Sequence, residues 1–101
     1  MIGLLAAAVL AAPTMLPPKP LAIGETVTLE ALGTERAVNI VVPPDYAAEP
    51  DRRWPVIYLL DGAVTQDLMM GAGLMRWGAL WGRHKDAIIV GIETKDRQRE
   101  L

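Results

Sequence analysis

The sequence predicts an α/β fold in which an antiparallel pair of strands precedes a parallel β-α-β unit. Residues 56–60 and 87–92 are continuously apolar, and residues 67–83 between them carry large apolar side chains at helical spacing. Before them, residues 26–30 and 37–42 are rich in β-branched residues and alternate in part between apolar and polar side chains. Apolar strands joined by a helix form a right-handed crossover with parallel strands, whereas strands joined by a short turn pair antiparallel.

The composition limits both the size and the class of the protein. A chain of 101 residues suffices for one small domain. Hydrophobic residues make up 51% and charged residues 22%, a balance that favours a packed core over disorder. The net charge is −2 and no run of basic residues exceeds Arg52-Arg53, so nucleic-acid binding is not expected. The chain has no cysteine and no serine, which excludes the two commonest nucleophiles within it.

Residues 1–20 differ from the rest of the chain. Residues 2–12 form an apolar run, and several prolines follow before the charged part of the sequence begins. The run is too short to span a membrane, so no stable membrane anchor is expected. Its pattern is typical of a secretory signal peptide and a spacer, which predicts a secreted or periplasmic protein whose folded part is 21–101. Since no basic residue opens the segment, a start upstream of Met1 or a docked tail is the alternative.

The strands have clear boundaries. A turn at Gly33 separates the first two, and Pro43-Pro44 ends the second because proline cannot donate a hydrogen bond to a neighbouring strand. The apolar strands at 56–60 and 87–92 lack alternation, which is typical of strands that are buried on both faces of a sheet. We therefore expect both of them inside the sheet.

The segment 67–83 predicts an amphipathic helix with Asp67 as a candidate N-cap. The large apolar residues of the segment are spaced by four, three and four, at Met70, Leu74, Trp77 and Trp81. Such a stripe normally packs into the core, and a ligand-binding face built on the two tryptophans is the alternative. Glycines within the segment weaken an isolated helix, so packing must stabilise it.

The candidate site is the turn Asp61-Gly62-Ala63, directly after the strand at 56–60. In open α/β sheets ligands bind at the carboxyl ends of the strands, and this turn lies at such an end. Its functional interpretation is a loop whose backbone N–H groups point at a developing oxyanion. The alternative is a plain Asp-Gly turn that tolerates positive φ.

Other candidate residues are weaker. His84 is the single histidine, and without serine or cysteine it could activate only threonine, lysine or water, so we interpret it as a helix-terminal residue. The glycines at 71–82 do not match a dinucleotide-binding fingerprint, and no group of acidic residues has the spacing of metal ligands, so neither a cofactor nor a metal is expected. The charged cluster at 93–100 is interpreted as a solvated loop, or as a group that pairs internally and fixes that loop.

Five short motifs follow one another between Gly24 and Leu101. They are Leu32-Gly33-x-x-Arg36, Ile40-x-x-Pro43-x-x-Tyr46, Trp54-Pro55-Val56-Ile57-Tyr58-Leu59-Leu60-Asp61-Gly62, Ile89-Val90-Gly91-Ile92 and Asp96-Arg97-x-Arg99-Glu100-Leu101. In this order they resemble the N-terminal part of the putative-esterase family of α/β-hydrolases. That family includes enterochelin-type esterases, feruloyl esterases, S-formylglutathione hydrolases and mycolyltransferases.

The resemblance implies the N-terminal part of an α/β-hydrolase sheet and serine-dependent hydrolysis of a small-molecule carboxylic ester. It implies that the backbone N–H of Ala63 is one oxyanion donor. It also implies that the strand at 56–60 pairs on one side with 87–92 and has an open edge on the other. In the family the nucleophile lies in a G-x-S-x-G elbow after the next strand, and the acid and the histidine follow later. We therefore expect a chain that is truncated before the nucleophile elbow and inactive by itself.

Two functions of other classes remain open on the sequence alone. The chain could be a small non-catalytic binding or accessory module, with Trp77 and Trp81 facing a ligand. It could also be a structural remnant that pairs with a partner through its open strand edge. The sequence indicates neither the ester substrate nor the oligomeric state.

Overall fold

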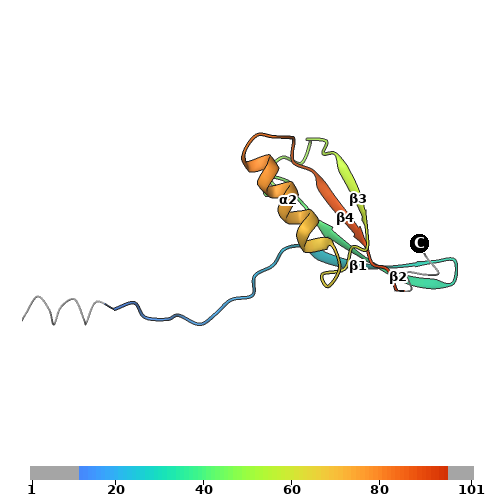
Figure 1. Cartoon of the computed structure of the whole chain (residues 1–101), viewed down its shortest axis with the longest axis horizontal. Helices are drawn as coiled ribbons and strands as arrows, with labels where there is room; N and C mark the ends of the chain where they lie inside the picture. Colours follow the sequence, from blue (N-terminus) through green and yellow to red (C-terminus); the bar gives the residue numbers. More distant parts are fainter. Residues whose placement is uncertain (1–11, 96–101) are drawn as a thin grey trace, which may run out of the picture.

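The computed structural model describes residues 12–95, which form a four-stranded sheet with one helix across it (Figure 1). Along the chain the elements are β1 (Glu25–Ala31), β2 (Thr34–Val41), β3 (Val56–Leu60), α2 (Leu68–Leu80) and β4 (Ile88–Ile92). The strand order across the sheet is β1-β2-β4-β3, so β4 is central and β3 lies at an edge. The predicted α/β class is confirmed.

The strand pairing follows the prediction in its main points. β1 and β2 are antiparallel, whereas β3 and β4 are parallel and α2 is the crossover between them. β2 also pairs antiparallel with β4, which joins the two predicted units into one mixed sheet. The open outer edge of β3 is the one that the family resemblance implied.

The hairpin between β1 and β2 closes through two residues with positive φ. Leu32 has φ 54° and Gly33 has φ 76°, the pattern of a type I′ turn, whose twist matches that of the flanking strands. Glycine adopts this backbone freely, but leucine does not. The Leu32 side chain is also fully exposed, so it gains no packing in return.

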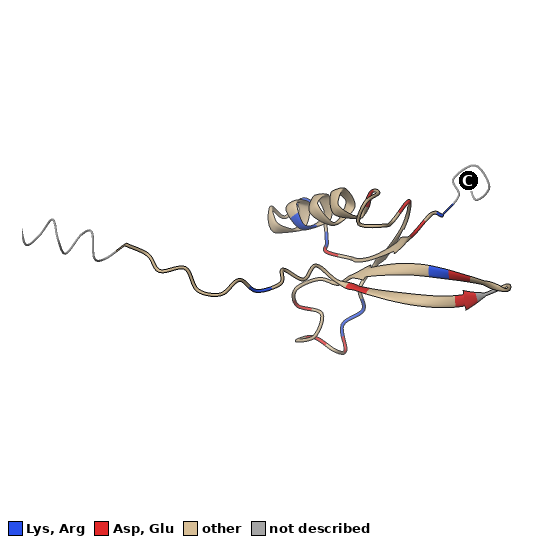
Figure 2. Ribbon diagram, turned by 90° about the horizontal axis from the view of Figure 1, so that it is seen from below, with Lys and Arg blue, Asp and Glu red and all other residues tan. Residues whose placement is uncertain are grey.

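The helix packs on one face of the sheet, and the connection between β2 and β3 lies on the opposite side (Figure 2). Leu68 at the start of α2 is buried. Ala87, just before β4, and Ile89 within β4 are also buried. A Cβ at Gly71 would lie 2.9 Å from Leu59 Cδ2, and one at Gly78 would overlap the His84 ring. Two of the glycines that weaken an isolated helix, Gly71 and Gly78, therefore allow close contact with Leu59 and His84.

The predicted burial of the apolar stripe on α2 is wrong. Its large side chains are between 53 and 66% exposed, at Met70, Leu74, Trp77 and Trp81. The helix faces Leu59 of the sheet with the small residue Gly71, where a Cβ would meet the end of the Leu59 side chain. Asp67 is the N-cap residue as predicted, although its side chain makes no capping hydrogen bond.

The predicted burial of β3 on both faces is also wrong. Val56, Ile57, Tyr58 and Leu60 are exposed, and Leu59 is partly buried. β3 has one neighbouring strand among the described residues, and α2 makes its main sheet contacts over β4. An apolar edge strand is left open to solvent as a result.

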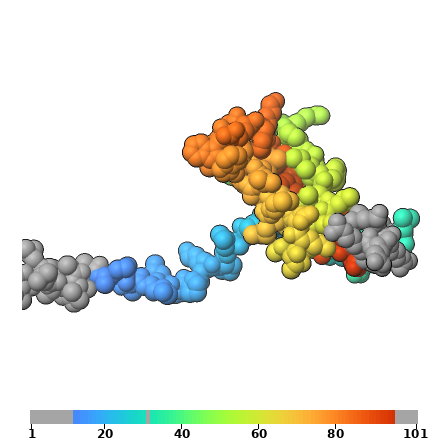
Figure 3. All heavy atoms as spheres, viewed as in Figure 1, coloured from blue at the N-terminus to red at the C-terminus, as the bar shows by residue number. Residues whose placement is uncertain are grey.

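The chain before β1 extends away from the sheet (Figures 1 and 3). Residues 12–20, the described part of the predicted signal peptide and spacer, contain no helix or strand and are exposed. Residues 1–11 of that prediction lie outside the described residues, so the domain boundary remains a prediction. Within 12–95, no helix is long and apolar enough to cross a membrane.

Candidate functional site

The candidate site is the β3–α2 loop, residues 61–67, at the carboxyl ends of the parallel strands β3 and β4. The loop begins with Asp61 at φ 53°, and the Asp61 carbonyl accepts a hydrogen bond of 2.7 Å from the N–H of Asp67. Aspartate is among the few residues that adopt this backbone with little strain. The loop is therefore closed on itself by a backbone hydrogen bond just before α2 begins.

Gly62 is fixed against the central strand. Its N–H donates to the Ile92 carbonyl at 2.8 Å, which continues the parallel ladder by one bond beyond β3. A Cβ at Gly62 would overlap the backbone of Gly91 and Ile92. The Asp-Gly turn interpretation expected a turn that tolerates positive φ, and in the structure the residue with positive φ is Asp61. Gly62 is required for another reason, because its backbone lies very close to the backbone of β4.

The Ala63 N–H, the implied oxyanion donor, has a hydrogen-bond partner in this structure. It donates to Gln66 Oε1 at 3.1 Å. Gln66 also bonds to the segment after β4, because Nε2 donates to the Thr94 carbonyl at 3.0 Å and Oε1 accepts from the Thr94 N–H at 3.4 Å. Gln66 is exposed, so this contact is accessible from solvent.

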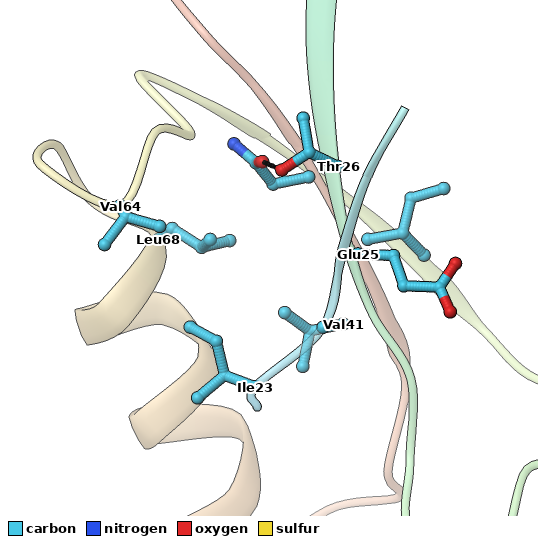
Figure 4. Close-up of a pocket in the computed structure, with 9 residues that line it drawn as sticks. Ile23, Glu25, Thr26, Val41, Val64 and Leu68 are labelled. Atoms are coloured by element: carbon cyan, nitrogen blue, oxygen red, sulfur yellow. Dashed lines mark hydrogen bonds between the residues drawn. The ribbon is translucent and has the colours of Figure 1, made fainter. Parts of the chain in front are cut away.

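A buried amide holds the opposite side of the same loop. Asn39 of β2 is 4% exposed, and its Nδ2 donates to the Gly62 carbonyl and to Glu93 Oε2, both at 2.8 Å. Its Oδ1 accepts a hydrogen bond of 2.6 Å from Thr26 Oγ1 of β1 (Figure 4). Neither Asn39 nor Gln66 was a candidate on the sequence. The available signal was that Asn39 is the one strongly polar residue in the segment 37–42.

Two hollows flank this network. A polar hollow of about 400 Å³ lies beside the loop, lined by Asp61, Thr65, Gln66, Asp67, Thr94 and Lys95. A small apolar pocket of about 60 Å³ lies under the loop, where Val64 and Leu68 face Ile23 and Val41 (Figure 4). Thr26 and Asn39, which are joined by their hydrogen bond, also line this pocket. The polar hollow is the one that the Gln66 amide faces.

His84 lies away from the loop. It follows α2, so the 13-residue helix, about 20 Å long, separates it from the loop. Its Nδ1 donates to the Lys85 carbonyl at 2.9 Å, and its ring lies against Gly78. This placement agrees with the helix-terminal interpretation of His84. Of the two exposed tryptophans, Trp77 lies in α2 and Trp81 is the C-cap residue of that helix. Arg83 stacks over the Trp77 ring at 5.0 Å.

The described part of the charged cluster pairs with the protein rather than being fully solvated. Glu93 accepts the Asn39 hydrogen bond, and Lys95 Nζ donates to the Glu35 carbonyl at 2.9 Å. Asp96, Arg97, Arg99 and Glu100 lie outside the described residues. Within 12–95, no three acidic or histidine side chains are grouped to hold a metal ion, and the expectation of a metal-free site stays a prediction.

Comparisons with known proteins concern most of the chain. Residues 29–100 match the model of the family described as Putative esterase. A solved structure described as a ferulic acid esterase is 21% identical, with a TM-score of 0.53 over 67% of this chain and 28% of that one. The BES protein from Bacillus cereus is 24% identical, with a TM-score of 0.58 over 82% of this chain and 31% of that one. No curated protein matches the chain in sequence.

The match covers only part of each solved structure. The chain spans less than a third of the length of either solved structure. At these identities the likeness concerns the fold alone. The sheet and its crossover helix therefore belong to a fold that the chain shares with part of each of these structures.

Proposed function

The chain belongs to the Putative esterase family, and from this premise we propose that it is the N-terminal part of a secreted or periplasmic serine carboxylic-ester hydrolase. The observation that carries the proposal is the Gly62–Ala63 peptide at the carboxyl end of β3. Its N–H is held on a loop fixed by backbone hydrogen bonds and meets an exposed, neutral acceptor, Gln66 Oε1. A donor in this position suits an oxyanion that forms on an ester carbonyl.

The chemistry assigned to this chain is oxyanion stabilisation. When a serine oxygen adds to the ester carbonyl carbon, the carbonyl oxygen gains negative charge, and a fixed backbone N–H lowers the energy of that state. Removal of one such donor typically costs about 10²–10³ in kcat. The 101 residues contain no serine. The nucleophile, the acid and the histidine are therefore proposed to belong to sequence that follows Leu101 in the gene.

The contact with Gln66 is compatible with this role. A neutral hydrogen bond in an exposed position contributes about 1 kcal/mol net, whereas a bond to an ionised oxygen is roughly twice as strong. A developing oxyanion can therefore replace Gln66 Oε1 as the acceptor of the Ala63 N–H. In the absence of substrate, Gln66 keeps that donor satisfied.

The open edge of β3 supports the assignment to a larger sheet. Val56, Tyr58 and Leu60 are apolar and exposed there. A long exposed apolar edge strand is a site of aggregation, and proteins usually cover it. A further parallel strand along this edge would pair with the backbone of β3 and bring its own carboxyl end beside the site loop.

The first test is to sequence the gene through and beyond codon 101. A frame that continues into a strand and G-x-S-x-G, with an acid and a histidine later, supports the proposal. The encoded protein should then hydrolyse p-nitrophenyl acetate and react with a fluorophosphonate, and the Ser→Ala variant of the elbow should do neither. The 101-residue chain is the control and should show no hydrolysis above background. A stop directly after codon 101, or reproducible turnover by the 101-residue chain, would overturn the proposal.

Export is tested separately. The composition of residues 1–20 supports it, through an apolar run followed by small residues and prolines. Fusion of residues 1–20 to alkaline phosphatase, which is active only after export, should give phosphatase activity in bacterial cells. Fusion of residues 21–40 is the matched control and should give none. Equal activity from both fusions, or none from either, counts against export.

A further inference from the structure

The Gly62–Ala63 peptide is held from both sides, and the two sides differ in burial. We propose that Asn39 is the positioning residue of the Ala63 N–H, an inference that rests on the proposed function of that donor. Asn39 lies in β2 and is 23 residues before Gly62, yet its Nδ2 reaches the Gly62 carbonyl at 2.8 Å. The bond is buried, unlike the contact between Ala63 and Gln66.

The planarity of the peptide bond connects the two contacts. In a trans peptide the C=O and the following N–H lie in one plane and point in opposite directions. The structure has no cis peptide bond among its described residues. Fixing the direction of the Gly62 carbonyl therefore fixes the direction of the Ala63 N–H. Asn39 orients the donor without touching the substrate.

Asn39 is itself held in one orientation. Both Nδ2 hydrogens are used, one by the Gly62 carbonyl and one by the Glu93 carboxylate, and these two groups are acceptors. The remaining atom, Oδ1, accepts from the Thr26 hydroxyl. A flipped amide would place Oδ1 against two acceptors, so a single orientation is stable. A buried amide is costly unless its hydrogen bonds are made, and here all three polar positions are satisfied.

The sheet also leaves space for this hydrogen bond. Asn39 is opposite Gly91 in the antiparallel register of β2 and β4. A Cβ at Gly91 would lie 2.7 Å from the Gly62 carbonyl oxygen, the same atom that accepts from Asn39. Glycine at this position lets the carbonyl approach the central strand. Asn39, Gly91 and Gly62 thus form one arrangement that fixes a single peptide plane.

The division of roles between Asn39 and Gln66 follows from their burial. Gln66 is exposed and can give up the Ala63 N–H when an oxyanion takes its place. Asn39 remains bound to the carbonyl on the buried side. The N–H therefore keeps its direction during the reaction, which is the condition under which a fixed donor accelerates it.

The test compares Asn39→Leu with Thr26→Val. Asn39→Leu keeps a side chain of similar volume but removes the two hydrogen bonds that Nδ2 donates to Gly62 and Glu93. Thr26→Val removes only the hydrogen bond to Asn39 Oδ1 and leaves the bond from Asn39 to Gly62. In the 101-residue chain, hydrogen exchange of the Ala63 amide is measured by NMR. We expect exchange at Ala63 to rise at least about tenfold in Asn39→Leu and to stay within about twofold in Thr26→Val, because the first variant releases the peptide and the second does not. Equal exchange in both variants overturns the inference.

A kinetic readout separates positioning from stability. In the enzyme encoded by the continued gene, active sites are counted with a fluorophosphonate, and rates are given per active site. We expect Asn39→Leu to lower kcat at least about tenfold with KM within about twofold, because the donor acts on the transition state. Unchanged kcat per active site means that Asn39 is structural only, and the inference fails.

A second variant covers the case in which Asn39→Leu does not fold. Gly91→Ala places a methyl group against the same carbonyl oxygen and leaves the Asn39 side chain unchanged. It should raise Ala63 exchange and lower kcat in the same direction. If the gene holds no hydrolase frame, the proposed function fails. The exchange measurement still decides whether Asn39 orients the peptide.

Discussion

Leu59 of β3 meets α2 at Gly71, where a Cβ would lie 2.9 Å from Leu59 Cδ2. This contact sets how closely the helix approaches the sheet. Two positions further along the helix, Gly73 has nothing within 4 Å of a Cβ. The two glycines therefore provide a matched pair for separating helix propensity from packing.

Gly73→Ala should stabilise the fold by more than Gly71→Ala does. Alanine gains about 0.5–1 kcal/mol over glycine inside a helix, and Gly73→Ala should show that gain in full. At Gly71 the methyl group meets the end of the flexible Leu59 side chain, and the displacement of that side chain offsets part or all of the gain. Urea unfolding followed by circular dichroism measures both. Equal stabilisation by the two variants would mean that α2 does not pack on Leu59 as described.

Leu32→Asn should stabilise the β1–β2 hairpin by about 0.5–1 kcal/mol, because asparagine adopts positive φ far more readily than leucine. The leucine side chain is fully exposed, so no packing is lost. Leu32→Val is the control and should lower the stability of the hairpin, since a β-branched residue is strained at φ 54°. The expected order of thermal midpoints is Asn, then Leu, then Val. Any other order contradicts the type I′ geometry.

Gly62→Ala and Asp61→Val should both disturb the β3–α2 loop, for different reasons. At Gly62 a methyl group overlaps the β4 backbone, and the expected cost is at least about 2 kcal/mol. At Asp61 a β-branched residue is strained at φ 53°, which costs about 1–2 kcal/mol. Asp61→Asn keeps a residue that tolerates this backbone and is the control. Chemical denaturation measures all three, and a neutral Gly62→Ala would contradict the close approach.

Gln66→Glu should lower the esterase activity of the enzyme encoded by the continued gene. A carboxylate accepts the Ala63 N–H more strongly than an amide oxygen does, and it repels a developing oxyanion. We expect kcat/KM to fall at least about tenfold in Gln66→Glu and less than about threefold in Gln66→Ala. Initial rates on p-nitrophenyl acetate measure the effect. Equal losses in the two variants would show that Gln66 does not compete for the donor.

The strands, the pairing of β1 with β2 and of β3 with β4, and the position of the site loop could be predicted from the sequence, whereas the pairing of β2 with β4 was not. Apolar runs and alternation depend on neighbouring residues, and the loop after Leu60 follows from the general position of sites in α/β sheets. The side of α2 that faces the sheet could not be predicted. The apolar stripe predicted that its own side of the helix faces the sheet. In the structure the stripe is exposed, and the side that carries Gly71 contacts Leu59.

The contacts that fix the site loop were also beyond the sequence pattern. The bond from Asn39 to Gly62 joins residues that are 23 apart, and the bond from Gln66 to Thr94 joins residues that are 28 apart. Such pairs depend on the strand order and register, which place Asn39 beside Gly91. A polar residue within an apolar strand is the local signal that remains, and it indicates a buried hydrogen bond without naming the partner.

The central place of β4 in the sheet also determines the order in which the chain can assemble. The β1–β2 hairpin is local and can form while the chain is still being synthesised. β3 has no partner at that stage, because its neighbour β4 comes later in the sequence than α2. Entry of β4 between β2 and β3 therefore completes the sheet in one event. Until then the apolar strand Val56–Leu60 is unpaired along both edges, and the synthesis of β4 provides a partner for one of them.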